Sequence, residues 1–213
     1  MNKIDYKAEY KELYMPTNIP TLLDVPDIAF IMIDGVGNPN EVDGEYAKAL
    51  EILYGLACTI KMLKMGKEKL EGYFEYVVPP LEGLWWTKEN QELPKGFDKK
   101  TLCWTAMIRQ PDFVTKEVFD WACSSLKEKK NLNVDLARFE ILKEGKCVQC
   151  MHIGSYDNED VTIDKLHHFI DENNLEKDFS HRQHHEIYLS DPRKTTLENI
   201  KTVIRLPVKA KMI

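Results

Sequence analysis

The same order of predicted elements occurs twice along this chain. In residues 28–110 an apolar strand (28–33) ends in a glycine turn, and a helix and two further strands follow. In residues 146–208 a strand ends at Gly154 and is again followed by a helix and two strands. The repetition predicts an α+β fold built from two βαββ modules, with helices over one face of an antiparallel sheet. The other face must then be buried, hydrated or occupied by a ligand.

Hydrophobic periodicity sets the expected boundaries of these elements. Apolar residues recur at intervals of three and four over 43–64, so we expect a helix there, with Asp43 as its N-cap and Gly66 as its stop. Further helices are expected over 115–129 and 161–172. Apolar runs bounded by turn residues predict strands at 28–33, 73–78, 81–86, 102–108, 138–142, 146–153, 184–189 and 201–207.

The remaining segments are assigned to the same single domain, residues 1–213. Residues 1–27 are expected to form an N-terminal arm that docks on the modules or begins with a short helix, and residues 111–145 to form a connecting helix and strand. The strands at 138–142 and 146–153 read as a hairpin around Gly145. The polar stretch 87–100 reads as a loop.

Charge and composition exclude several classes of protein. The formal net charge is −6 and no local basic stripe compensates for it, which disfavours direct nucleic-acid binding. The longest apolar run, residues 28–33, is far shorter than the roughly 20 residues of a membrane-spanning helix. The N-terminus has no apolar signal region, and the five cysteines are an odd number. We therefore expect a cytoplasmic protein with reduced thiols and no membrane partner.

Cys147 and Cys150 have the CxxC spacing of zinc and redox sites. They fall within a predicted strand, where positions i and i+3 point to opposite faces. The two thiols are therefore not expected to share a metal, and no second CxxC is present. We predict no metal site and no cofactor.

The closing segment places titratable groups in strand alternation. His184, Glu186 and Tyr188 should share one face, while His185 and Ile187 should point into the core. The first set puts a carboxylate between an imidazole and a phenol. Such a face is either a binding site or an ordinary hydrated polar face.

A second group combines aromatic residues with an acid. Trp85, Trp86 and Trp104 lie on adjacent predicted strands, and Glu82 is three residues before Trp85. Aromatic walls with a carboxylate suit flat apolar or cationic ligands. The alternative is a tryptophan-rich core with Glu82 at an exposed turn.

Six segments of the chain, in order, resemble stand-alone GyrI-like small-molecule-binding proteins. They are FIMIDG at 30–35, GNPN at 37–40, PLEGLWW at 80–86, MIRQP at 107–111, HIG at 152–154 and HHEIYLSDPR at 184–193. The resemblance implies two βαββ modules side by side with a ligand cleft between them. One branch of the family includes hydrolases of cyclopropane-bearing, DNA-alkylating natural products, with a glutamate pair and aromatic walls at the site.

By motif position the resemblance implies that Glu82 and Glu186 form this catalytic pair. We expect both to converge on one water molecule, with a hydrogen-bond donor such as Tyr188 polarising the substrate carbonyl. The residues expected to contact the ligand are Trp85, Trp86, Trp104, Met107, His152, Tyr156 and Tyr188. The expected function is binding of flat hydrophobic or cationic small molecules and hydrolysis of strained electrophiles, as a detoxification. The alternative is a protein that sequesters or senses such ligands without turnover. Partner proteins are not predicted.

Overall fold

Nine strands form one curled antiparallel sheet within the residues that the computed structural model describes, which are 3–65, 70–88, 93, 96–130 and 132–211. The strands are β1 (Thr21–Val25), β2 (Ile28–Val36), β3 (Leu81–Thr87), β4 (Leu102–Arg109), β5 (Arg138–Leu142), β6 (Gly145–Ile153), β7 (Leu175–Lys177), β8 (His184–Tyr188) and β9 (Lys201–Ala210). They are hydrogen-bonded in the order β1-β6-β9-β8-β3-β4-β2-β5, and β7 pairs with β9.

The strand order confirms the repeated modules. The first module contributes β2, β4 and β3 in that spatial order, and the second contributes β8, β9 and β6. The second strand of each module, β3 and β8, pair with each other at the centre of the sheet. The chain therefore has the expected α+β fold, with the two modules joined through one continuous sheet.

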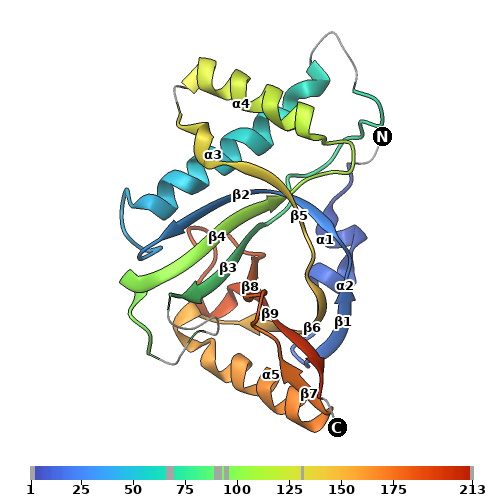
Figure 1. Cartoon of the computed structure of the whole chain (residues 1–213), viewed down its shortest axis with the longest axis vertical. Helices are drawn as coiled ribbons and strands as arrows, with labels where there is room; N and C mark the ends of the chain where they lie inside the picture. Colours follow the sequence, from blue (N-terminus) through green and yellow to red (C-terminus); the bar gives the residue numbers. More distant parts are fainter. Residues whose placement is uncertain (1–2, 66–69, 89–92, 94–95, 131, 212–213) are drawn as a thin grey trace.

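The three long helices cover one face of the sheet. They are α3 (Glu45–Lys61), α4 (Lys116–Lys130) and α5 (Asp160–Glu172). Figure 1 shows α3 and α4 over the first module and α5 over the second, so β3 and β8 lie between the two helical layers. Single 3-10 turns occur at Met62–Met65, Lys99–Thr101, Val134–Leu136, Tyr156–Asn158 and Leu197–Asn199. None of the helices described is both long and apolar enough to cross a membrane.

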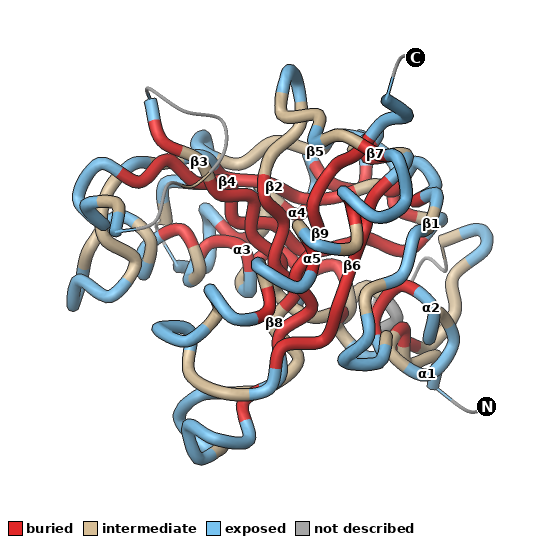
Figure 2. The backbone as a smooth tube through the Cα atoms, turned by 90° about the horizontal axis from the view of Figure 1, so that it is seen from below, coloured by how far each residue is buried: buried red, intermediate tan, exposed pale blue. Residues whose placement is uncertain are grey.

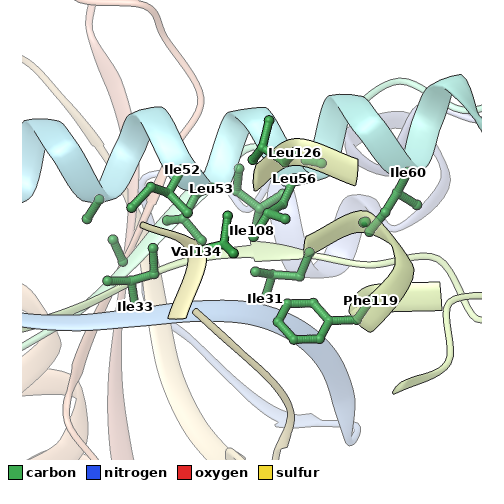
Figure 3. Packing of buried hydrophobic residues seen from close by; sticks show 14 of the residues in the cluster. Ile31, Ile33, Ile52, Leu53, Leu56, Ile60, Ile108, Phe119, Leu126 and Val134 are labelled. Carbon is green, nitrogen blue, oxygen red and sulfur yellow. The ribbon is translucent and has the colours of Figure 1, made fainter. Parts of the chain in front are cut away.

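The apolar face of α3 builds the core of the first module. Ile52, Leu56 and Ile60 recur at four-residue intervals and are buried against Ile31 and Ile33 of β2. Figure 3 shows side chains of α4 closing this core, with Leu126 near Leu56 and Phe119 beside Ile31. Burial on this scale explains why the helix is stable although the opposite side of α3 is exposed.

The N-terminal arm closes the other face of the sheet. It contains two short helices, α1 (Tyr6–Glu9) and α2 (Lys11–Tyr14), and its aromatic residues join a separate core cluster with side chains from the central strands. The guanidinium group of Arg109 lies 4.7 Å from the ring centre of Tyr6 and 4.3 Å from that of Tyr10. In Figure 2 the buried residues accordingly follow the central strands, while loops and outer helix faces are exposed.

Several expected boundaries were wrong. Asp43 has a φ of +59° and precedes the N-cap, which is Gly44. Residues 73–78 do not form a strand of the sheet; Tyr76 makes only an isolated bridge with Ile4 of the arm. The two prolines that follow lack N–H donors, which limits pairing at this point. The expected stop, Gly66, lies outside the described residues.

The expected hairpin between 138–142 and 146–153 is also wrong. The two strands exist as β5 and β6, but β5 pairs with β2 while β6 pairs with β1 and β9. Their connection carries the chain from the edge of the first module to the second. A short turn with a glycine at positive φ, here Gly145 at +64°, is compatible with either topology, so local turn residues could not decide between them.

Candidate functional site

A large cavity opens between α3 and α5, above the central strands β3 and β8. Its volume is about 2240 Å³. The sheet contributes Trp85, Glu186 and Tyr188, while α3 contributes Tyr46. The turn before α5 contributes Tyr156 and Glu159. Aromatic rings and several carboxyl groups, among them those of Glu159 and Glu186, therefore line the wall where the two modules join.

Both carboxylate oxygens of Glu186 have hydrogen-bond partners. The Tyr188 hydroxyl donates to Oε2 at 2.8 Å, and Nε2 of His184 lies 3.0 Å from Oε1. Strand alternation places the three side chains on one face, as their spacing of two requires. The indole N–H of Trp85 donates to the Tyr188 oxygen at 2.8 Å. The hydroxyl hydrogen of Tyr188 is thus engaged in its hydrogen bond to Glu186. Together these hydrogen bonds fix the orientation of the Glu186 carboxylate in the cavity wall.

A glycine in β3 leaves room for the hydrogen bond between Trp85 and Tyr188. Gly83 pairs with Glu186 across the two central strands. A Cβ atom at Gly83 would lie 2.7 Å from Nε1 of Trp85 and 3.1 Å from the Tyr188 hydroxyl. The absence of a side chain at this position is therefore what allows the indole to lie across the strand.

Glu159 provides the second carboxyl group. Burial, and then the negative charge of Glu186, raise the pKa of the Glu159 carboxyl well above its usual range. Its Oε1 atom is buried and has no hydrogen-bond partner among the described residues. The shift favours the protonated form of Glu159, so Glu159 and Glu186 are two carboxyl groups of the cavity wall with different environments.

His152 positions the turn that carries Glu159. Its Nδ1 atom lies 2.9 Å from Oγ1 of Thr162 in α5, and its Nε2 atom lies 3.0 Å from the carbonyl oxygen of Ser155. The imidazole thereby connects the end of β6 to the first turn of α5. His152 does not line the cavity, but it fixes the segment in which Tyr156 packs edge-on against Tyr188, with ring centres 6.0 Å apart.

Glu82 lies on the opposite face of the sheet from Glu186. It is the neighbour of Gly83, which pairs with Glu186, so alternation along β3 turns its side chain away from the cavity. There it accepts a hydrogen bond from the Tyr14 hydroxyl at 3.1 Å and lies 2.9 Å from Nε2 of His185. The expected convergence of Glu82 and Glu186 on one water molecule is therefore not formed.

Besides His152, three more of the expected ligand contacts are absent from the cavity lining. Trp86 and Met107 pack in the core cluster beneath the N-terminal arm, on the face that holds Glu82. Trp104 faces the helices but is covered, with its ring centre 5.0 Å from that of Tyr46. Of the three tryptophans on adjacent strands, only Trp85 lines the cavity.

The sequence reasoning missed Glu159 and Tyr46. Glu159 is the residue before α5 and Tyr46 the second residue of α3, and an acid or an aromatic residue near a helix start is too common to indicate a site. The pairing of Trp85 with Trp104 and of Gly83 with Glu186 could have placed the centre of the site, but both pairings depend on the strand order.

The two cysteines of the CxxC motif lie on opposite faces of β6. Cys147 packs in the cluster beneath the arm, whereas Cys150 packs in the cluster under α5, on the other face of β6. This is the separation that strand alternation predicts. No three histidine, cysteine, aspartate or glutamate side chains among the described residues lie close enough to hold a metal ion.

Comparison with known proteins adds a family and several solved structures. The family model described as "GyrI-like small molecule binding domain" matches residues 20–209. No curated protein matches the chain. An uncharacterized conserved protein from Listeria innocua is 44% identical, with a TM-score of 0.89, over 97% of this chain and 100% of that one.

Two further solved structures extend this comparison. A protein described as a hydrolase from Listeria innocua is 43% identical, with a TM-score of 0.89, over 98% of this chain and 100% of that one. The C-terminal domain of EcmrR is 12% identical, with a TM-score of 0.53, over 90% of this chain and 97% of that one, and shares the fold.

Proposed function

This chain belongs to the family of GyrI-like small-molecule-binding domains, and we propose that it hydrolyses strained electrophilic small molecules, such as cyclopropane-bearing genotoxins. The observation that carries the proposal is the pair of Glu186 and Glu159 inside an aromatic cavity, the first held by hydrogen-bond partners and the second with a pKa raised well above its usual range. Similar proteins of 43% identity that are described as hydrolases support it.

The cavity walls select the ligand. Tyr46, Trp85, Tyr156 and Tyr188 present aromatic surface that favours flat apolar groups. The rings and the carboxylate of Glu186 would also attract a delocalised cation. We therefore propose an aromatic substrate. The acidic net charge disfavours direct contact with nucleic acid, so the proposed detoxification acts on the small molecule itself.

The proposed chemistry is the addition of water to a cyclopropane conjugated with a carbonyl group. Glu186 accepts a proton from water as the water oxygen bonds to a ring carbon. The ring C–C bond breaks, and its electron pair moves into the conjugated system to give an enolate or phenolate oxygen. Glu159 donates its proton to that oxygen, and proton exchange with solvent restores both carboxyl groups. The product carries one added hydroxyl group and one added hydrogen.

In this mechanism Tyr188 does not polarise the substrate carbonyl, which is the role expected for it from the sequence. Because the Tyr188 hydroxyl donates to Glu186, its hydrogen is not directed at a substrate carbonyl. The proposed proton donor to the substrate oxygen is Glu159 in its protonated form. Tyr188 instead orients the base, together with His184 and Trp85.

A binding protein without turnover is the second candidate. The same aromatic walls and the Glu186 side chain would retain a cationic aromatic ligand with no reaction at all. More than one product per protein molecule from a cyclopropane-fused dienone supports the enzyme. Protection of the compound at a one-to-one ratio, with no product, supports sequestration.

We predict that substitution Glu159→Gln changes the pH profile of hydrolysis in a specific way. The wild-type rate should fall as pH rises through the raised pKa of Glu159, because the proton donor is then lost. Glutamine does not titrate but still offers a hydrogen-bond donor. The variant should therefore be slower at neutral pH and should lack the alkaline decline.

The measurement is single-turnover hydrolysis of a cyclopropane-fused dienone over a range of pH, with protein folding checked by circular dichroism at each point. The substitution Asp120→Asn, in an exposed ion pair on α4 and outside the cavity lining, is the control and should keep the wild-type profile. An unchanged alkaline decline in Glu159→Gln would exclude Glu159 as the donor.

A further inference from the structure

We propose that a second, smaller pocket beside the N-terminal arm binds a small amphipathic anion, a short aliphatic chain that ends in a carboxylate. The pocket has a volume of about 320 Å³ and lies between the arm and the edge of the sheet where β8 ends and β9 begins. Its ligand is separate from the ligand of the large cavity, and the inference does not depend on the proposed hydrolysis.

Three lysines from separate parts of the fold line this pocket. Lys7 belongs to α1, Lys11 to α2, and Lys201 is the first residue of β9. Lys201 is two residues before Val203, which packs beneath the arm, so strand alternation turns its side chain to the same face. Leu189 donates its backbone N–H to the carbonyl oxygen of Lys201 at 3.0 Å and also packs on this face. The arm and the sheet edge therefore bring the three ammonium groups to one pocket.

The charges of these lysines are not neutralised by the protein. None of the three makes an ion pair with another residue in the part of the chain that the structure describes, whereas Lys209, farther along β9, pairs with Glu176. The acid in the pocket lining, Asp5, accepts the backbone N–H of Lys7 at 3.0 Å and so caps α1. In a chain with a net charge of −6, this local excess of positive charge favours an anionic ligand.

The rest of the lining favours an apolar part in the same ligand. It consists of Ala8, Met15 and Leu189. Met15 is 44% exposed, so the fold leaves part of this apolar surface uncovered. The pocket volume of about 320 Å³ is at the lower end of the roughly 300–1,000 Å³ that is typical of ligand pockets, which suits a short chain.

The pocket adjoins the large cavity, but the two can be tested separately. Lys7 and Leu189 line both of them. Lys11, Met15 and Lys201 line the smaller pocket and are absent from the lining of the large cavity. Substitutions at these three positions therefore change the proposed anion site without changing the walls around Glu186.

The test follows backbone amide and indole N–H signals of the ¹⁵N-labelled protein by NMR during titration with three probes. Hexanoate has both the chain and the charge, hexanamide has the chain without the charge, and acetate has the charge without the chain. The variants are Lys11→Ala/Lys201→Ala and Met15→Ser. The matched control is Lys209→Ala/Lys211→Ala, which removes the same charge from exposed lysines at the other end of β9.

We expect hexanoate to bind saturably and to shift the amide signals of α1, α2, Leu189 and Lys201. Lys11→Ala/Lys201→Ala should weaken hexanoate at least about tenfold, and the control pair less than about twofold. Hexanamide and acetate should each bind at least about fivefold more weakly than hexanoate, because each lacks one of the two interactions. Met15→Ser should weaken hexanoate and leave acetate unchanged, and added salt should weaken hexanoate in the wild-type protein.

Hexanoate that shifts the indole N–H of Trp85 but not the signals of the arm would place it in the large cavity and overturn the proposal. Equal affinity of the wild-type protein and Lys11→Ala/Lys201→Ala would do the same. Equal affinity for hexanoate and acetate would also reject the site, because the apolar lining would then have no part in binding. Since no probe contains a cyclopropane, none of these outcomes decides whether the protein is a hydrolase.

Discussion

Substitution Glu186→Gln should slow hydrolysis of a cyclopropane-bearing aryl substrate about 10²–10⁴-fold, the usual contribution of a general base. The amide has the shape of the carboxylate and its oxygen can still accept from Tyr188, but it cannot take a proton from water. The aromatic walls are unchanged, so ligand affinity should stay within a few-fold of wild type. Single-turnover kinetics and calorimetric binding measure the two effects separately.

Glu82→Gln provides the contrasting variant. Glu82 and Glu186 lie on adjacent central strands but on opposite faces of the sheet, and Glu82 is bonded to Tyr14 and His185. The folded Glu82→Gln protein should therefore turn over at close to the wild-type rate while losing stability. Wild-type turnover in Glu186→Gln together with lost turnover in a well-folded Glu82→Gln would reverse the assignment of the base.

The second large effect concerns the buried charges around Glu82. His185 lies between two carboxylates, with Nε2 at 2.9 Å from Glu82 and Nδ1 at 2.8 Å from Glu144. Arg205 donates to Glu144 at 2.7 Å and to the carbonyl oxygen of Leu13 at 3.1 Å. All four charged side chains are buried, so the array joins the N-terminal arm to both modules without access to water.

We predict that Glu144→Gln lowers the free energy of unfolding by about 3–5 kcal/mol, because it leaves the cations of His185 and Arg205 buried without their shared anion. For a chain of this length that corresponds to a melting temperature lower by roughly 6–20 °C. Chemical denaturation and calorimetry measure both. Glu140→Gln, in an exposed ion pair with Arg138, is the control and should change stability by less than about 1 kcal/mol.

The pH dependence of this array has a definite sign. Burial alone would lower the pKa of His185, but the charge and hydrogen bond of Glu144, with the hydrogen bond of Glu82, outweigh it and raise the pKa from 6.5 to about 9. A raised pKa stabilises the fold below 6.5, and that stabilisation is lost as pH rises through 9. For Glu144, burial is outweighed by Arg205 and His185, which lower its pKa from 4.5 to about 2.

The carboxylate therefore stabilises the fold above pH 4.5, and this contribution is lost as pH falls through 2. Stability should decline between pH 7 and 10 in the wild-type protein and decline less in Glu144→Gln. A stability difference between the two proteins of under about 1 kcal/mol at pH 7 would show that the array does not hold the arm.

The sequence predicted the fold because its signals there are local. Apolar periodicity marks α3, α4 and α5 and most central strands, and the repeated order of elements indicates the two modules. Alternation along β8 likewise placed His184, Glu186 and Tyr188 together. Each of these inferences needs only the side-chain periodicity of a single helix or strand.

The site depended on relations between elements, which local patterns do not contain. Glu82 and Trp85 are three residues apart on β3, so alternation already places them on opposite faces, but only the pairing of β3 with β8 shows that Trp85 shares the face of Glu186. Glu159 enters the site because α5 packs over β6, a contact that no motif encodes. These two facts are why the proposed site pairs Glu186 with Glu159 and not with Glu82.

The most direct test of the central claim is a crystal structure of the Glu186→Gln protein with an intact cyclopropane-fused dienone. We predict that the ligand lies between Tyr46, Trp85 and Tyr156, with the cyclopropane carbon facing residue 186 and the carbonyl oxygen within hydrogen-bonding distance of Glu159. A ligand bound outside the cavity between α3 and α5, or with its cyclopropane directed away from both carboxyl positions, would contradict the account.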